Sequence, residues 1–166
     1  MNNENAIRIR KAIPQDLESI LRLDQALFAL DMHWDKTLDP DWTRSEAGLT
    51  FFKERTQGVD ESLLLVAEYS DNVESKVVGY LSGAIVEADD YRCVRRLAEL
   101  ECFCVDEAFR SGGVGKQLVN RFLSWSREKK AERINVRVTY ANHRAIAFYE
   151  RVGFVKHDLI LEHPLG

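Results

Sequence analysis

A glycine-rich turn lies in the second half of the chain, in the segment Phe109-Arg110-Ser111-Gly112-Gly113-Val114-Gly115-Lys116. Glycine lets a backbone turn sharply and approach a ligand closely. The first amides of a following helix lack internal partners and carry partial positive charge, so a phosphate group would fit there. The same residues also fit a plain tight turn that is capped by Ser111.

Two common phosphate-binding motifs do not match this turn. A nucleoside-triphosphate loop needs glycine five residues before Gly115 and Ser or Thr after the lysine, where this chain has Arg110 and Gln117. The dinucleotide fingerprint needs a third glycine three residues beyond Gly115, where this chain has Leu118. Both alternatives therefore fail on spacing.

A second pattern lies closer to the C-terminus, where the chain reads N-x-x-A-x-x-F-Y-E-x-x-G-F from Asn142 to Phe154. Together with R-x-x-G-x-G from Arg110 to Gly115, it resembles the two signatures of the GNAT superfamily of N-acetyltransferases. The resemblance covers roughly residues 99–154. It implies that acetyl-CoA is the co-substrate and that the chain catalyses acetyl transfer to an amine.

The resemblance also implies roles for individual residues. The diphosphate of acetyl-CoA would be held by the turn amides, and Arg110 would shape or contact that site; the amides belong to Gly112, Gly113, Val114, Gly115 and Lys116. The strand that ends near Val105 would splay from the next one, so that Phe103 and Val105 lie beside the peptide-like pantetheine arm. Asn142 would contact the same arm.

Tyr149 would lie beside the sulfur, where its hydroxyl protonates or hydrogen-bonds the departing thiolate. A phenol is protonated at neutral pH and suits this acid role. The simpler interpretations are that Asn142 caps a helix and that Tyr149 is a core aromatic residue with its hydroxyl at the rim.

Attack on a thioester requires a neutral amine, so a group that accepts a proton is expected. Strand alternation predicts that Glu99 and Glu101 share a face with Phe103 and Val105. We favour Glu101 as the base, with Glu99, a water chain, or a purely solvated or ion-paired role for both as alternatives. Cys102 and Cys104 are then expected on the opposite face as buried free thiols, which argues against a covalent acetyl-cysteine route.

The elements that position these residues can be predicted from hydrophobic periodicity. Strands grouped first, followed by alternating strands and helices, indicate an α/β fold with a mixed, mostly antiparallel sheet of about six or seven strands and helices on both faces. Strands are expected near residues 6–13, 62–69, 76–86, 97–105, 134–138 and 154–162, and helices near 14–31, 43–55, 114–130 and 142–151.

The 166 residues, with 45% hydrophobic and 30% charged, fit a single domain spanning 1–166. No apolar run is long enough for a bilayer span or a secretory signal, and the three cysteines are an odd number, so we expect a cytoplasmic protein without a membrane partner. A net charge of −4 does not favour nucleic acid, and the histidines show no metal spacing.

The acceptor is expected to dock against residues 31–45 and 86–97, where acidic side chains gather, although a solvated acidic loop has the same composition. This favours a small cationic amine, a polyamine, or a protein lysine or N-terminus. The resemblance adds that a homodimer is possible. Two alternatives remain open, namely a non-catalytic acyl-CoA-binding sensor and a protein-interaction domain that uses the basic residues Arg92, Arg95 and Arg96.

Overall fold

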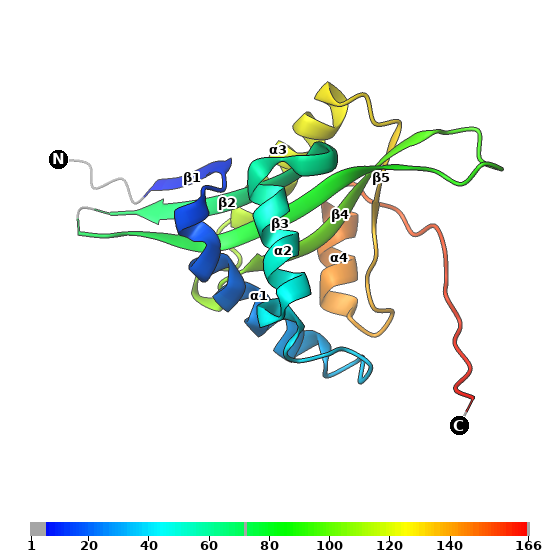
Figure 1. The fold of residues 1–166 in the computed structure, drawn as a ribbon, viewed down its shortest axis with the longest axis horizontal. Helices are drawn as coiled ribbons and strands as arrows, with labels where there is room; N and C mark the ends of the chain where they lie inside the picture. The colour runs from blue at the N-terminus through cyan, green and yellow to red at the C-terminus, as the bar shows by residue number, and fades with distance from the viewer. Residues whose placement is uncertain (1–5, 72, 166) are drawn as a thin grey trace.

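A five-stranded sheet forms the centre of the protein in a computed structural model, which describes residues 6–71 and 73–165 (Figure 1). Its strands lie in sequence order, and they are β1 (Ala6–Lys11), β2 (Ser62–Ser70), β3 (Ser75–Glu87), β4 (Arg96–Val105) and β5 (Arg133–Val136). The first three pairs are antiparallel, and β4 and β5 are parallel. The predicted mixed, mostly antiparallel sheet is confirmed, whereas residues 1–5, 72 and 166 of the expected domain lie outside the described residues.

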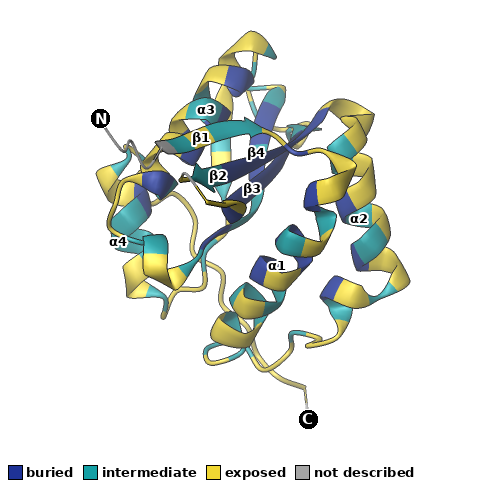
Figure 2. Cartoon of the chain, turned by 90° about the vertical axis from the view of Figure 1, so that its left-hand side faces the viewer, coloured by how far each residue is buried: buried dark blue, intermediate teal, exposed yellow. Residues whose placement is uncertain are grey.

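Two pairs of helices cover the sheet, one pair on each face, as Figure 2 shows. They are α1 (Leu17–Asp31), α2 (Glu46–Gln57), α3 (Val114–Glu128) and α4 (His143–Arg151). One core, beneath α1 and α2, contains Ile20, Phe52 and Tyr80, whereas the other, beneath α3 and α4, contains Phe122 and Tyr149. Helices on both faces were predicted, and the structure confirms them.

Local signals account for where the α1 and α2 elements begin and end. Pro14 opens a 3-10 turn (Pro14–Asp16) that leads into α1, and the Ile13 amide donates to Asp16 at 2.8 Å. Ser45 caps α2 by accepting from the Gly48 amide at 3.2 Å. The helix ends at Gln57, and its C-cap residue Gly58 has a φ of 70°, which is accessible to glycine without a steric penalty.

The sixth strand that the sequence predicts, at residues 154–162, does not form. This segment enters no ladder with the described strands, and its residues are largely exposed. The strand predicted at 134–138 also ends early, at Val136. The expectation of six or seven strands is therefore corrected to five among the described residues. An alternating apolar pattern indicates extended backbone, but it does not determine whether that backbone pairs with another strand.

A β-bulge in β4 overturns the predicted sharing of faces. Ser82 pairs with Cys102 and Gly83 with Leu100, so Glu101 has no residue opposite it in β3. The extra residue reverses the alternation beyond it. The prediction that Glu99 and Glu101 share a face with Phe103 and Val105 is therefore wrong.

Core contacts on the two faces establish this reversal. Phe103 and Val105 pack in the core beneath α3 and α4, whereas Cys102 and Cys104 pack in the core beneath α1 and α2. The Glu101 carboxylate forms an ion pair with Arg55 of α2. The two cysteines therefore lie on the side of Glu101 and not opposite it, contrary to the sequence-based expectation.

Candidate active site

The strands β4 and β5 part at the position where the sequence motifs place the ligand. Their parallel ladder runs from the Leu97–Arg133 pair to the Leu100–Val136 pair and then ends. Within the described part of the chain, no strand pairs with this side of residues 101–105. The open edge contains Phe103 and Val105, and its backbone groups outside the ladder, apart from the Val105 carbonyl oxygen that Arg110 binds, offer partners to a ligand that carries amides.

The glycine turn leads directly from this open edge into α3. Gly113 is the N-cap of the helix with a φ of 81°, and it provides no side chain to satisfy the first helical amides. Gly112, Gly113 and Lys116 are exposed, whereas the Val114 side chain is buried in the core. The uncapped amides therefore face a region that an anionic group can enter.

Gly115 has a different role from its two neighbours, because it allows close aromatic packing. A Cβ atom at this position would lie 3.0 Å from Phe103 Cζ and 3.2 Å from Phe148 Cε2. The Phe103 and Phe148 rings are stacked with centroids 5.3 Å apart. The absent side chain thus lets the start of α3 approach both β4 and α4.

Arg110 shapes the turn rather than presenting a free charge. Its Nε donates a hydrogen bond to the carbonyl oxygen of Val105 at 2.8 Å. This contact ties the turn to the last residue of β4. Of the two roles that the resemblance implied for Arg110, the geometry favours the shaping role.

Tyr149 lies at the inner end of the site on α4 and is 8% exposed. Its ring centroid lies 6.3 Å from that of Phe103 and 5.3 Å from that of Phe148. Burial raises the pKa of the Tyr149 hydroxyl, and the charge of Asp31 adds to this shift. The hydroxyl therefore remains a hydrogen-bond donor at neutral pH.

Asn142 occupies the N-cap of α4. Its Oδ1 accepts a hydrogen bond from the Ala145 amide at 3.0 Å. The structure thus shows the capping role, and the expected contact with the pantetheine arm remains a prediction.

Glu101 forms a two-point ion pair, which is one of the alternatives that the sequence left open, with a partner that the sequence did not reveal. Arg55 of α2 donates from Nη2 to Oε1 at 2.5 Å and from Nε to Oε2 at 2.7 Å. The guanidinium carbon of Arg55 lies 3.5 Å from the Phe51 ring centroid, so the cation is also stacked on an aromatic face. Glu99, in contrast, makes no side-chain hydrogen bond or ion pair with any residue that the structure describes.

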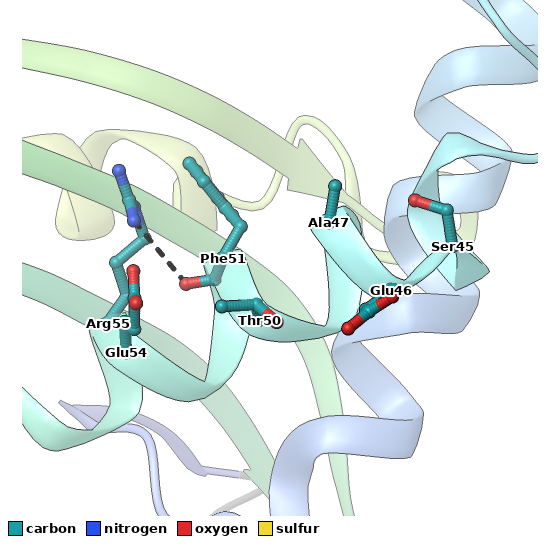
Figure 3. A pocket seen from close by; sticks show the side chains of 7 residues that line it. All are labelled: Ser45, Glu46, Ala47, Thr50, Phe51, Glu54 and Arg55. Carbon is teal, nitrogen blue, oxygen red and sulfur yellow. Dashed lines mark hydrogen bonds between the residues drawn. The ribbon is translucent and has the colours of Figure 1, made fainter.

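A groove of about 550 Å³ runs along α2 beside this ion pair (Figure 3). Arg55 lies at one end of the row of lining residues, which are Ser45, Glu46, Ala47, Thr50, Phe51, Glu54 and Arg55. The Arg55 Nη1 also donates to the carbonyl oxygen of Phe51, as the dashed line in Figure 3 marks. Arg55, which pairs with Glu101, is the lining residue that links the groove to the ion pair, and no lining residue belongs to the glycine turn.

The two strand cysteines are poor nucleophiles in this setting. Burial raises the pKa of the Cys102 thiol to about 12 and that of the Cys104 thiol to about 11. Both thiols therefore remain protonated at neutral pH, which argues against an acyl-cysteine intermediate.

The acidic residues after α1 are partly engaged by their own loop. Asp35 accepts from the amide and hydroxyl of Thr37, and Asp39 accepts from the Asp41 amide at 2.9 Å. Burial raises the pKa of Asp31, and the charges of Asp24 and Asp35 add to this shift. Asp31 at the end of α1 thus belongs to the electrostatic surroundings of Tyr149, whereas Asp35 and Asp39 stabilise a local turn.

Comparison with known proteins identifies the family. The family model described as "Acetyltransferase (GNAT) family" matches residues 26–154. The chain belongs to the GNAT family of acetyltransferases. This match includes the open edge of β4, the glycine turn and α4.

Three similar proteins illustrate the relationship. An uncharacterized N-acetyltransferase of Methanocaldococcus jannaschii is 30% identical over 66 residues, which are 40% of this chain and 29% of that relative. The alignment thus spans less than a third of the relative's length. A mutant protein from Bacillus halodurans, known from its crystal structure, is 26% identical with a TM-score of 0.78 over 95% of this chain and 99% of that one.

The third is an aminoglycoside N-acetyltransferase, AAC(6')-Iy, solved in complex with CoA. It is 18% identical to this GNAT chain, with a TM-score of 0.74 over 99% of this chain and 97% of that one. At this identity the likeness shows the shared fold.

Among residues 6–71 and 73–165, no helix has the length and apolar character needed to cross a bilayer.

Proposed function

We propose that this GNAT chain is an acetyl-CoA-dependent N-acetyltransferase that transfers the acetyl group to a primary amine by direct attack in a ternary complex. The observation that carries the proposal is the end of the β4–β5 ladder at Leu100–Val136, next to the uncapped start of α3 at Gly113. One open strand edge and one set of free helix amides match a ligand with amides at one end and a diphosphate at the other. The CoA-bound aminoglycoside acetyltransferase of the same fold supports this match.

In the proposed reaction, the acceptor nitrogen attacks the thioester carbonyl carbon and a tetrahedral intermediate forms. The carbon–sulfur bond then breaks, and the electron pair stays on sulfur as a thiolate. The Tyr149 hydroxyl donates a hydrogen bond to this thiolate, since its raised pKa keeps it protonated. The amide product and CoA leave the site.

The amine proton must reach an acceptor before or during attack, and we assign Glu101 to this task in preference to Glu99. Glu101 occupies the bulge one residue beyond the last β4–β5 pair, so it lies where the strands part. Each carboxylate oxygen accepts one hydrogen bond from Arg55 and retains a lone pair for a water molecule or an ammonium group. Transfer through one water would reconcile the ion pair with a base role.

A small cationic amine, a polyamine, or a protein lysine or N-terminus remains the proposed acceptor class. The α2 groove supports this class, because its Glu46 and Glu54 carry negative charge and the charge of Arg55 is compensated by Glu101. We place the protein in the cytoplasm as part of the proposal.

Release of CoA from acetyl-CoA in the presence of a panel of amines tests this function. The panel should contain a polyamine, an amino sugar, a lysine-containing peptide and an N-terminal peptide. Turnover with at least one amine is expected. Binding of acetyl-CoA without release of CoA with any amine would instead indicate a non-catalytic acyl-CoA sensor.

A further inference from the structure

The residues that line the α2 groove fall into two rows along the helix. Side chains four residues apart lie on the same face of a helix, one turn above the other. One row is polar and the other is apolar up to its last residue; the polar row is Glu46, Thr50 and Glu54, and the apolar row is Ala47, Phe51 and Arg55. Figure 3 shows the three side chains of the apolar row projecting to the same side of α2. The groove therefore offers an apolar surface with a polar edge beside it.

The apolar row leads to the base of the proposed reaction. The guanidinium carbon of Arg55 lies 3.5 Å from the centroid of the Phe51 ring, and the same guanidinium binds both carboxylate oxygens of Glu101. A linear molecule whose reacting amine lies at Glu101 can thus continue past Arg55 and along Phe51 toward Ala47. The groove is in this way continuous with the proposed reaction centre.

The polar row carries two carboxylates whose neighbouring cations are engaged elsewhere. Arg44, just before α2, donates to both oxygens of a carboxylate on α1, and Arg55 pairs with Glu101. Glu46 and Glu54 are exposed and form no ion pair with any residue in 6–71 and 73–165. Two such carboxylates on one edge of a groove favour a ligand with positive charge.

The spacing of these carboxylates indicates more than one positive charge on the ligand. Glu46 and Glu54 are separated by about 12 Å along the axis of α2, at 1.5 Å per residue. Thr50 lies midway between them, and its hydroxyl can accept a hydrogen bond. A single ammonium group, such as that of a lysine or a protein N-terminus, would leave at least one carboxylate without a partner. A narrow apolar chain with several ammonium groups matches both rows.

We propose that the α2 groove binds the non-reacting part of a linear polyamine acceptor. Its methylene chain lies on Ala47 and Phe51, a second ammonium group contacts Glu54, and the distal ammonium group contacts Glu46. The terminal amine then reaches Glu101. This inference rests on the proposed function, and it selects one of the acceptor classes named there by giving each charge of the acceptor a partner.

The ratio of kcat/KM for spermine to kcat/KM for an unbranched monoamine of similar length tests this proposal. The wild type should favour spermine by roughly tenfold, as two exposed ion pairs imply. Glu54→Gln and Glu46→Gln should each lower the ratio about twofold to fivefold, and the double variant should bring it close to one. High salt should reduce the ratio of the wild type in the same direction, because it screens exposed charges.

Two further variants separate a specific subsite from general attraction of a polycation. Glu162→Gln is the matched control, because Glu162 is exposed after α4 and its loss changes the net charge equally, and this variant should keep the ratio of the wild type. Thr50→Lys places a cation between the two carboxylates and should lower the ratio as far as the double variant does. A wild-type ratio near one, or an equal loss in Glu162→Gln and Glu54→Gln, overturns the subsite while the acetyltransferase function stands.

Calorimetric titration of spermine into the chain saturated with CoA distinguishes the two levels of the proposal. We expect binding that weakens in the double variant Glu46→Gln with Glu54→Gln and persists in Glu162→Gln. The same binding pattern without acetylation of any amine would overturn the proposed function and leave the groove as a polyamine site. A wild type that binds no spermine overturns the subsite.

Discussion

The two sides of β4 contribute to the candidate site in different ways. Toward α3 and α4, the site is made largely of backbone, with the open edge of residues 101–105, the amides after Gly113 and glycine positions that allow close approach, together with the Tyr149 side chain. Toward α1 and α2, it is made of side chains far apart in sequence, with Arg55 against Glu101. The residues of the cofactor side can thus be found from short sequence motifs, whereas the residues of the acceptor side are brought together only by tertiary packing.

The largest expected effect concerns the base on the acceptor side. Glu101→Gln should lower kcat by about 10²-fold or more, since general-base catalysis typically contributes ~10²–10⁴-fold. The matched variant Glu99→Gln should change kcat little, because Glu99 makes no side-chain contact of this kind within the described chain. Steady-state rates of CoA release decide between them, and the opposite pattern would move the base role to Glu99.

The cofactor side predicts the next largest effect, at Tyr149. Tyr149→Phe removes the hydroxyl and leaves the aromatic packing, so kcat should fall roughly 10–100-fold, as a lost hydrogen bond to a charged group of about 1.5–3 kcal/mol implies. The Michaelis constant for acetyl-CoA should hardly change. Unchanged turnover at saturating substrates would remove Tyr149 from the chemistry.

These two sides were not equally predictable from the sequence. The order and extent of most strands and helices follow from periodicity, and the glycine turn and Tyr149 follow from motifs that are local in the chain. The Arg55–Glu101 pair joins residues 46 positions apart, and no local pattern reveals it. The bulge at Glu101 was equally hidden, because strict alternation assumes an unbroken ladder.

The predicted strand at 154–162 failed for a related reason. Its pattern of apolar residues is sound for extended backbone, but the position of a strand in a sheet depends on a partner edge. The segment has no such partner within the described residues of one chain. The sequence of the segment therefore favours extended backbone, but it does not specify a neighbouring strand with which that backbone could pair.

Removal of the Arg55 charge sharpens the contrast between the two sides. Arg55→Met keeps an unbranched apolar stem near Phe51 and leaves the Glu101 carboxylate without its partner. We expect kcat to fall about tenfold, equivalent to roughly 1.4 kcal/mol. Acetyl-CoA affinity should remain unchanged, because Arg55 does not touch the glycine turn.

A double-mutant comparison distinguishes this role from a general loss of packing. In a Glu101→Gln background, Arg55→Met should cause no further decrease in kcat. Additive losses would mean that Arg55 acts independently of Glu101. Thermal unfolding of each variant provides the control for stability.

The smallest expected effect concerns the buried core beneath α1 and α2. Asp24 is fully buried and accepts hydrogen bonds from Tyr80 at 2.5 Å and Thr43 at 2.6 Å. Burial raises the pKa of Asp24, although these two hydrogen bonds oppose the shift. Its protonated form therefore stabilises the fold below the unfolded pKa of about 3.9, and this contribution is lost as pH rises through the folded value.

Urea unfolding of the wild type and Asp24→Asn between pH 4 and neutral pH tests this sign. The stability of the wild type relative to the variant should decline as pH rises, by on the order of 1 kcal/mol. A relative stability that increases with pH would show that the hydrogen bonds outweigh burial. Acetyl-CoA binding should be the same in both proteins at each pH.

Calorimetric titration with acetyl-CoA tests the central claim most directly, namely that the amides after Gly113 hold its diphosphate. The wild type should bind one molecule per chain. Gly113→Val places a β-branched residue at a φ of 81° and should weaken binding roughly 10–100-fold, whereas the control Gly58→Val, with a φ of 70° at the end of α2, should leave the affinity intact. A wild type that does not bind acetyl-CoA, or a Gly113→Val variant that binds it equally well, would contradict the account.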